Sequence, residues 1–262
     1  MTGMISAGSV LVSLTAYGAD EVRRHGQAGF ARLARAAGAD GIEVRSELLR
    51  GGAAELDGLA DLVAESGMAC VYSSAQGMWD ADGRFDGDAV REGLERARRL
   101  GAKVLKMSIG GRRPGDAAGM DVLRDALAVS PVTLLVENDQ TEAAGSVPAL
   151  SSFFRAADAA GVSLGMTFDV GNWHWVGECP LEAARVFAAR VRYVHCKGVL
   201  RRPDRWVAVP LQTSAAPWRA VLRALPAAAF RAIEYPLTGA DLEHVTRQAL
   251  NALRRLEQMS DE

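Results

Sequence analysis

The chain has 262 residues, of which 49% are hydrophobic and 24% are charged, and its net charge is −2. This length and composition suit one globular domain spanning residues 1–262, and the scattered basic residues exclude the polybasic stripe that is typical of nucleic-acid binding. No stretch reaches the ~18 consecutive apolar residues of a membrane span and no signal peptide is recognisable, so we expect a cytoplasmic protein.

Strand-like and helix-like segments alternate along the first half of the chain. Apolar runs predict strands at residues 9–17, 41–44, 68–73 and 102–108. Amphipathic stretches predict helices at residues 20–37, 52–65 and 88–100, and another that starts near residue 116. Glycine precedes several of the strands, as in AAGADGIEV and RLGAKVL, where it suits the left-handed turn that ends a helix.

The second half repeats this alternation. Strands are predicted at VTLLVE (132–137), SLGMTFD (163–169), VRYVH (191–195) and FRAIEY (230–235). Helices are predicted near residues 147–160, 180–189, 215–225 and 241–259, with a long loop after residue 195. Eight strand–helix units imply parallel pairing, because parallel neighbours need a crossover connection. With no phosphate-binding glycine motif after the first strand, the pattern favours an α/β fold, a single (β/α)8 barrel.

Each of the last four predicted strands carries a potential metal ligand where it gives way to a loop. These ligands are Glu137, Asp169, His195 and Glu234. In a closed parallel barrel, the carboxyl ends of the strands lie on one face, where barrel enzymes carry their active sites, so we expect the four side chains to converge. Three carboxylates and one imidazole suit a divalent cation, with Mn²⁺ as the first expectation and Mg²⁺, Co²⁺ or Zn²⁺ as alternatives.

Further polar residues lie close to these strand ends. We expect Lys106, Asn138, Asn172, His174 and Lys197 to contact a polar small-molecule substrate such as a polyol, keto acid or other carboxylate. For His174, which lies between two tryptophans, packing and function are equally consistent with the sequence.

Glu43 and Arg45 are two residues apart at the end of the second predicted strand. We expect them to form a structural ion pair inside the barrel mouth. A supporting contact from Glu43 to a metal ligand is the alternative.

These residues resemble the sugar phosphate isomerase/epimerase superfamily, the xylose isomerase-like TIM barrels, with motif similarity over residues 132–236. The resemblance implies that Glu137, Asp169, His195 and Glu234 bind the metal. It also implies that Glu137 and Glu234 form an acid/base pair that moves a proton next to a carbonyl through a metal-stabilised enediolate. Arg201 stands where ketose epimerases place a substrate-binding arginine. Relatives are often dimers or tetramers, so the resemblance is compatible with a homo-oligomer.

The chain departs from the family after His195, because many relatives carry an aspartate where this sequence continues as Cys196-Lys197-Gly198. Its four histidines cannot supply the three-metal cluster of the endonuclease IV branch, so we do not expect a role on DNA. The first interpretation is an isomerase or epimerase of a sugar, ketose or related hydroxy-carbonyl compound. The alternatives are a lyase of the 3-dehydroshikimate or inosose dehydratase type and a non-catalytic relative that binds a small ligand.

Overall fold

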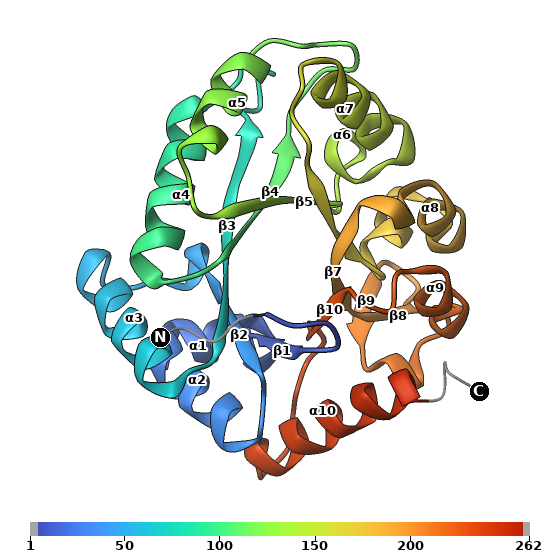
Figure 1. The fold of residues 1–262 in the computed structure, drawn as a ribbon. Coiled ribbons are helices and arrows are strands. Elements are labelled where there is room, and N and C mark those ends of the chain that lie inside the picture. Colours follow the sequence, from blue (N-terminus) through green and yellow to red (C-terminus); the bar gives the residue numbers. More distant parts are fainter. Residues whose placement is uncertain (1–4, 259–262) are drawn as a thin grey trace.

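Eight parallel strands close into a barrel in the computed structural model, which describes residues 5–258 (Figure 1). The order around the barrel is β1, β10, β7, β6, β5, β4, β3, β2. The strands are β1 (Val10–Ser13), β2 (Gly41–Arg45), β3 (Ala69–Trp79), β4 (Val104–Gly110), β5 (Thr133–Glu137), β6 (Gly165–Asp169), β7 (Val191–Cys196) and β10 (Phe230–Ile233). The predicted (β/α)8 barrel is confirmed.

Helices surround the ring of strands (Figure 1). The α-helices are α1 (Ala19–His25), α2 (Gln27–Ala36), α3 (Ala53–Ser66), α4 (Gly87–Leu100), α5 (Met120–Ala128), α6 (Glu142–Gly145), α7 (Val147–Ala159), α8 (Pro180–Phe187), α9 (Trp218–Ala224) and α10 (Leu242–Gln258). The helices bury an apolar face, as α4 does with Val90, Leu94 and Ala97 at helical spacing. Within the described part of the chain, no helix is long and apolar enough to cross a membrane.

Two of the predicted helices differ from the observed ones because of glycine. The helix expected over 20–37 is divided into α1 and α2 at Gly26, whose φ of 81° lies in the left-handed region. The helix expected from residue 116 begins at Met120, directly after Gly119 with φ 84°. A left-handed residue cannot continue a right-handed helix, so each glycine sets a boundary. Residue 259, the expected end of the last helix, lies outside the described residues.

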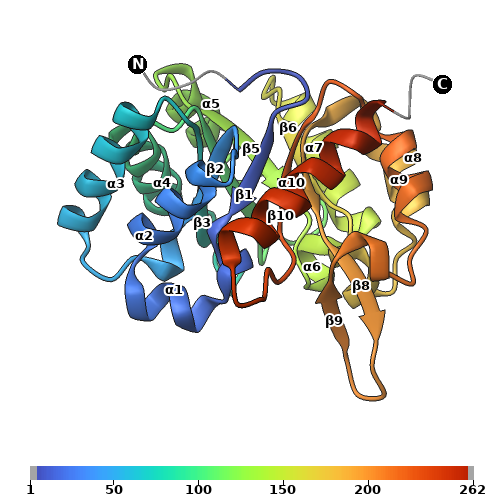
Figure 2. The same cartoon turned by 90° about the horizontal axis from the view of Figure 1, so that it is seen from below.

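The strand expected over residues 9–17 is shorter than predicted. It ends at Ser13, and the next four residues form the 3-10 helix η1 (Leu14–Tyr17). The long loop expected after β7 contains an antiparallel hairpin of β8 (Gly198–Arg201) and β9 (Trp206–Val209). This hairpin projects away from the barrel (Figure 2). Its strands contain valine, which favours the extended conformation, and Pro203-Asp204 lies at the turn between them, but the sequence lacks the two-residue Asn-Gly type of hairpin signal.

The barrel interior contains an apolar layer with a polar layer above it. The apolar layer includes Leu11, Val71, Val104, Leu135 and Tyr193. Because every second residue of a strand points to the same side, the next inward position on each of these strands lies two residues further on. Those positions are occupied by Ser13, Ser73, Lys106, Glu137 and His195. Polar side chains therefore fill the carboxyl end of the barrel, and the apolar layer lies directly beneath them.

Candidate metal centre

The four candidate metal ligands lie together at the carboxyl end of the barrel. One ligand atom from each of Glu137, Asp169, His195 and Glu234 lies within 4.8 Å of the others. Ligand atoms gathered this closely would suit a single divalent ion. The Asp169 and His195 side chains are fully buried, while those of Glu137 and Glu234 are 14% and 9% exposed.

His195 lies at the centre of this cluster. Its Nδ1 atom is 2.9 Å from Oε1 of Glu137 and 2.9 Å from Oε2 of Glu234. Its Nε2 atom is 2.8 Å from Oε2 of Glu43. Burial lowers the pKa of His195, but the carboxylates of Glu234 and Glu43 outweigh burial and hold this pKa well above its ordinary value. The ring therefore carries a proton on the side where a cation would bind.

Lys197 supplies a second cation to the cluster. Its Nζ atom lies 2.7 Å from Oδ2 of Asp169 and 2.9 Å from Oε2 of Glu234. Burial raises the pKa of Asp169 to about 7, although Lys197 opposes the rise. Oδ2 of Asp169 is buried and its nearest charged partner is the ammonium group of Lys197, so a metal ion that binds this oxygen takes the place of that contact. This donor set fits a hard or borderline divalent cation.

A basic side chain holds one oxygen of each glutamate. Lys106 Nζ lies 2.7 Å from Oε2 of Glu137, and Arg45 Nη1 lies 2.7 Å from Oε1 of Glu234. Burial raises the pKa of Glu137, but Lys106 and His195 lower it to a value below the ordinary one. The pKa of Glu234 is likewise raised by burial and is held well below its ordinary value by His195 and Lys197. Both carboxyl groups are therefore ionised, with one oxygen directed to the cluster.

Asn138 and Asn172 form hydrogen bonds that support Asp169 and Lys197. The Asn138 side chain is fully buried, accepts from the backbone N–H of Asp169 at 2.9 Å and donates to its carbonyl at 3.0 Å. Asn172 Oδ1 accepts from Lys197 Nζ at 3.1 Å. Asn138 thus joins the ends of β5 and β6, and Asn172 orients Lys197. Their expected contacts with a substrate stay predictions.

His174 and Arg201 lie apart from the four ligands. Within residues 5–258 neither shares a hydrogen bond or ion pair with them. The ring of His174, in η3 (Asn172–Val176), lies 5.0 Å from the ring of Trp206 on the hairpin, and burial lowers the pKa of this histidine. The Arg201 guanidinium lies over the same tryptophan at 5.5 Å. The structure therefore brings these two residues together around Trp206, which pairs with Arg201 next to the turn of the hairpin.

The expected ion pair between Glu43 and Arg45 is present, with Oε1 and Nη1 3.1 Å apart. Two residues that the sequence pattern did not indicate also contact Glu43. Ser13 Oγ donates to it at 3.0 Å, and the Tyr193 hydroxyl donates to it at 3.0 Å. The alternation of β7 could have indicated Tyr193, which is two residues before His195 and points to the same side.

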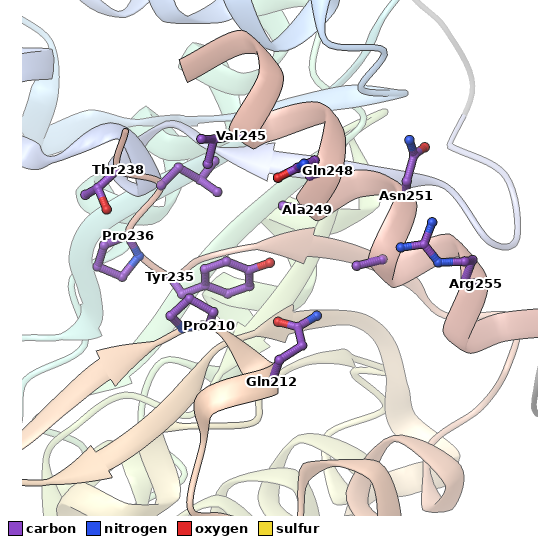
Figure 3. Close-up of a pocket in the computed structure, with 12 residues that line it drawn as sticks. Pro210, Gln212, Tyr235, Pro236, Thr238, Val245, Gln248, Ala249, Asn251 and Arg255 are labelled. Atoms are coloured by element: carbon purple, nitrogen blue, oxygen red, sulfur yellow. The ribbon is translucent and has the colours of Figure 1, made fainter. Parts of the chain in front are cut away.

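A separate hollow of about 600 Å³ lies outside the barrel, between α10 and the segment before α9 (Figure 3). Tyr235 and Pro236 line it on one side, and Gln248 and Asn251 line it on the other. None of the four candidate ligands lines this hollow, so the metal centre and the hollow are distinct features.

Comparison with protein families identifies the type of barrel. The family model of the xylose isomerase-like TIM barrels matches residues 31–256. The chain belongs to this family. The family resemblance seen in the sequence is thereby confirmed. None of the curated proteins matches the chain by sequence.

Solved structures resemble this xylose isomerase-like barrel over nearly its full length. L-ribulose 3-epimerase is 16% identical with a TM-score of 0.65, and the match covers 97% of this chain and 98% of that one. D-allulose 3-epimerase from Methylomonas sp. is 14% identical with a TM-score of 0.67, covering 97% and 99%. The probable 3-DHS dehydratase of petrobactin synthesis from Bacillus anthracis is 12% identical with a TM-score of 0.67, covering 94% and 98%. At these identities the likeness establishes the shared fold.

Proposed function

We propose that this xylose isomerase-like barrel is a divalent-metal-dependent isomerase or epimerase of a sugar, ketose or related hydroxy-carbonyl compound, with Mn²⁺ as the first expected metal. One observation carries the proposal: an oxygen of Glu137 and an oxygen of Glu234 each lie 2.9 Å from the same atom, Nδ1 of His195. Two ionised carboxylates around one metal ligand suit a reaction that takes a proton from carbon and returns it. The epimerases among the structural neighbours support a sugar-like substrate.

In this proposal Glu137 and Glu234 are the catalytic acid and base. One removes the proton from the carbon next to the substrate carbonyl. The other, once it has taken up a proton from solvent, delivers that proton to the opposite face of the carbon in an epimerase or to the neighbouring carbon in an isomerase. A bound divalent ion would stabilise the negative charge on the substrate oxygens, which is needed because a carboxylate is a weak base for a C–H proton.

The basic residues support this chemistry through the oxygens that they hold. Lys106 holds Oε2 of Glu137 and Arg45 holds Oε1 of Glu234, so each carboxylate keeps one oxygen for the reaction. Lys197, beside Asn172, is the cation placed to donate a hydrogen bond to a substrate oxygen. His174 and Arg201 would contact the substrate only at the outer side of the mouth, near Trp206.

A dehydratase-type lyase is the second candidate. The same two carboxylates could remove a proton and protonate a departing hydroxyl group on the next carbon. The fold does not separate the two reactions, because the dehydratase and the D-allulose epimerase match with the same TM-score of 0.67. The product distinguishes them, since a lyase releases water and an epimerase gives a stereoisomer.

A substrate screen in deuterated water tests the proposal. The protein with Mn²⁺ is incubated with ketoses, hydroxypyruvate, inosose and dehydroshikimate, and we expect deuterium from solvent in the substrate or product. Glu137→Gln and Glu234→Gln should each lose this exchange, whereas Glu142→Gln, which changes an exposed residue of α6, should keep it. If Glu137→Gln and Glu234→Gln exchange deuterium as fast as the wild type, the acid/base assignment is wrong. If the protein does not bind added Mn²⁺ and its exchange activity does not depend on Mn²⁺, the proposed metal site is wrong.

A further inference from the structure

Four side chains donate hydrogen bonds to the buried carboxylate of Glu43. Oε1 accepts from Ser13 Oγ at 3.0 Å and from Arg45 Nη1 at 3.1 Å. Oε2 accepts from the Tyr193 hydroxyl at 3.0 Å and from Nε2 of His195 at 2.8 Å. Glu43 is 0% exposed, so water does not compete for these oxygens. A carboxylate that receives two donors on each oxygen is fixed in orientation.

The charge of Glu43 decides which nitrogen of His195 carries hydrogen. An ionised carboxylate only accepts hydrogen bonds, so the Nε2 atom that lies against it must be the donor. In a neutral imidazole the other nitrogen is then an acceptor. That other nitrogen is Nδ1, the atom that faces Glu137 and Glu234. When Nδ1 loses its proton, the contact with Glu43 therefore keeps the remaining proton on Nε2 and leaves the lone pair of His195 on the side of the cluster.

Arg45 extends this control from His195 to Glu234. Its Nη1 atom lies 3.1 Å from Oε1 of Glu43 and 2.7 Å from Oε1 of Glu234, while Oε2 of Glu234 lies 2.9 Å from Nδ1 of His195. The four residues thus form a closed ring of polar contacts. In the barrel order β2 is adjacent to β1 and β3 and not to β7, so the ring crosses the barrel interior. It connects the end of β2 to the ligands of β7 and β10.

We infer that Glu43 is a positioning residue of the metal centre. It sets the tautomer of His195 and, through Arg45, holds the oxygen of Glu234 that faces away from the cluster. This inference rests on the proposed metal site and gives the buried pair a role beyond a structural ion pair. A histidine that binds a metal through one nitrogen commonly donates its other N–H to such an acceptor, and the acceptor strengthens and orients the ligand.

Two substitutions at Glu43 test separately the position of its carboxylate and its negative charge. Glu43→Asp keeps the charge but withdraws the carboxylate by one methylene, out of reach of Nε2. Glu43→Gln keeps the length but removes the charge and presents an amide N–H to groups that are themselves donors. We expect each to weaken Mn²⁺ binding about 10- to 100-fold in titration calorimetry of the folded protein. Ser13→Ala is the matched control, because it removes one donor to Glu43 and leaves the contact with His195.

Proton NMR of the Mg²⁺-loaded protein gives a second measurement. In the wild type we expect a downfield Nε2–H resonance of His195 that exchanges slowly with solvent, because the proton is buried and bound to a carboxylate. Glu43→Asp should shift this resonance upfield and speed its exchange, and Ser13→Ala should leave it in place.

The outcomes are distinct. Weaker Mn²⁺ binding together with the NMR change in Glu43→Asp supports the inference. A Glu43→Asp protein that loses thermal stability but keeps the wild-type Mn²⁺ affinity overturns it, because Glu43 is then only structural, while the metal site stands. If Glu43→Gln does not fold, the Mn²⁺ affinity and the NMR signal of Glu43→Asp still test whether Glu43 positions His195. A wild-type protein that binds no Mn²⁺ overturns the metal site and this inference with it.

Discussion

The ammonium nitrogen of Lys197 lies 2.7 Å from Oδ2 of Asp169, inside the group of atoms that would surround a metal ion. The lysine side chain is only 10% exposed, and its pKa is raised because the nearby carboxylates of Asp169 and Glu234 outweigh the cost of burial. Lys197 is therefore a fixed positive charge that balances the ligand carboxylates and must give up these contacts to a bound cation.

Lys197→Met should lower the stability of the metal-free protein and increase the stabilisation by Mn²⁺. Removing one partner of a buried ion pair leaves the other charge uncompensated, which costs on the order of 3 kcal/mol. A divalent ion would restore the missing charge. Thermal unfolding with and without Mn²⁺ measures both effects, and Lys103→Met, at an exposed position, is the control. An unchanged Mn²⁺-induced shift of Tm in Lys197→Met would contradict this competition.

Mn²⁺ binding should weaken as the pH falls from about 8 to about 6. Metal ligands bind in their deprotonated form, and the pKa of His195 is held well above its ordinary value while burial raises that of Asp169 to about 7. Both groups therefore hold protons that compete with the metal more strongly at lower pH. Each displaced proton lowers the apparent affinity about tenfold per pH unit. Calorimetry in two buffers of different ionisation enthalpy counts the released protons, and an affinity independent of pH would contradict the expectation.

Asn138→Ala should destabilise the fold. It removes two hydrogen bonds that bind the backbone N–H and carbonyl of Asp169 in a fully buried place. A buried polar group left unpaired costs roughly 1–3 kcal/mol. Urea unfolding measures the loss, with Asn251→Ala on the exposed side of α10 as the control. If Asn138 only contacts substrate, KM should rise while the free energy of unfolding stays at its wild-type value.

Gly198→Asp, which would introduce the acidic residue found in many relatives, should destabilise this protein. A Cβ atom at position 198 would lie 2.6 Å from the carbonyl oxygen of Val209 and 2.7 Å from that of Pro210. Backbone atoms cannot swing aside as a flexible side chain does, so we expect a cost of about 1–3 kcal/mol. Gly198→Ala should already show the loss, whereas Gly29→Ala, which meets nothing within 4 Å, should not. Thermal unfolding of the three variants makes the comparison.

The departure from the family at position 198 also shows where sequence reasoning stops. The sequence shows that glycine stands at position 198 in place of the expected aspartate, but it does not show why. The hairpin of β8 and β9 brings Val209 and Pro210 against Gly198, and this contact forms only when the segment after β7 folds back. The valines and Pro203-Asp204 are local signals for two strands and a turn, but they do not show against which residues the hairpin packs.

The positions of Glu137, Asp169, His195 and Glu234 could be predicted because each depends on local information. Each residue lies at or next to the end of an apolar run, and a parallel barrel places all such ends on one face. Their common neighbourhood then follows from the fold class. The subdivision of the first predicted helix at Gly26 was missed, because an isolated glycine within an amphipathic pattern does not reveal its φ angle.

The barrel, the family and the four candidate ligands could be predicted from the amino-acid sequence, because periodicity and strand ends are properties of short segments. The residues that hold those ligands in place are visible only in the folded chain. Glu43 and His195 are 152 residues apart in the chain and 2.8 Å apart in the barrel. Their contact depends on barrel closure and on the register of every strand between them, which places β2 and β7 across one interior. Short segments do not encode such a distance, so the partner of His195 became visible only in the folded chain.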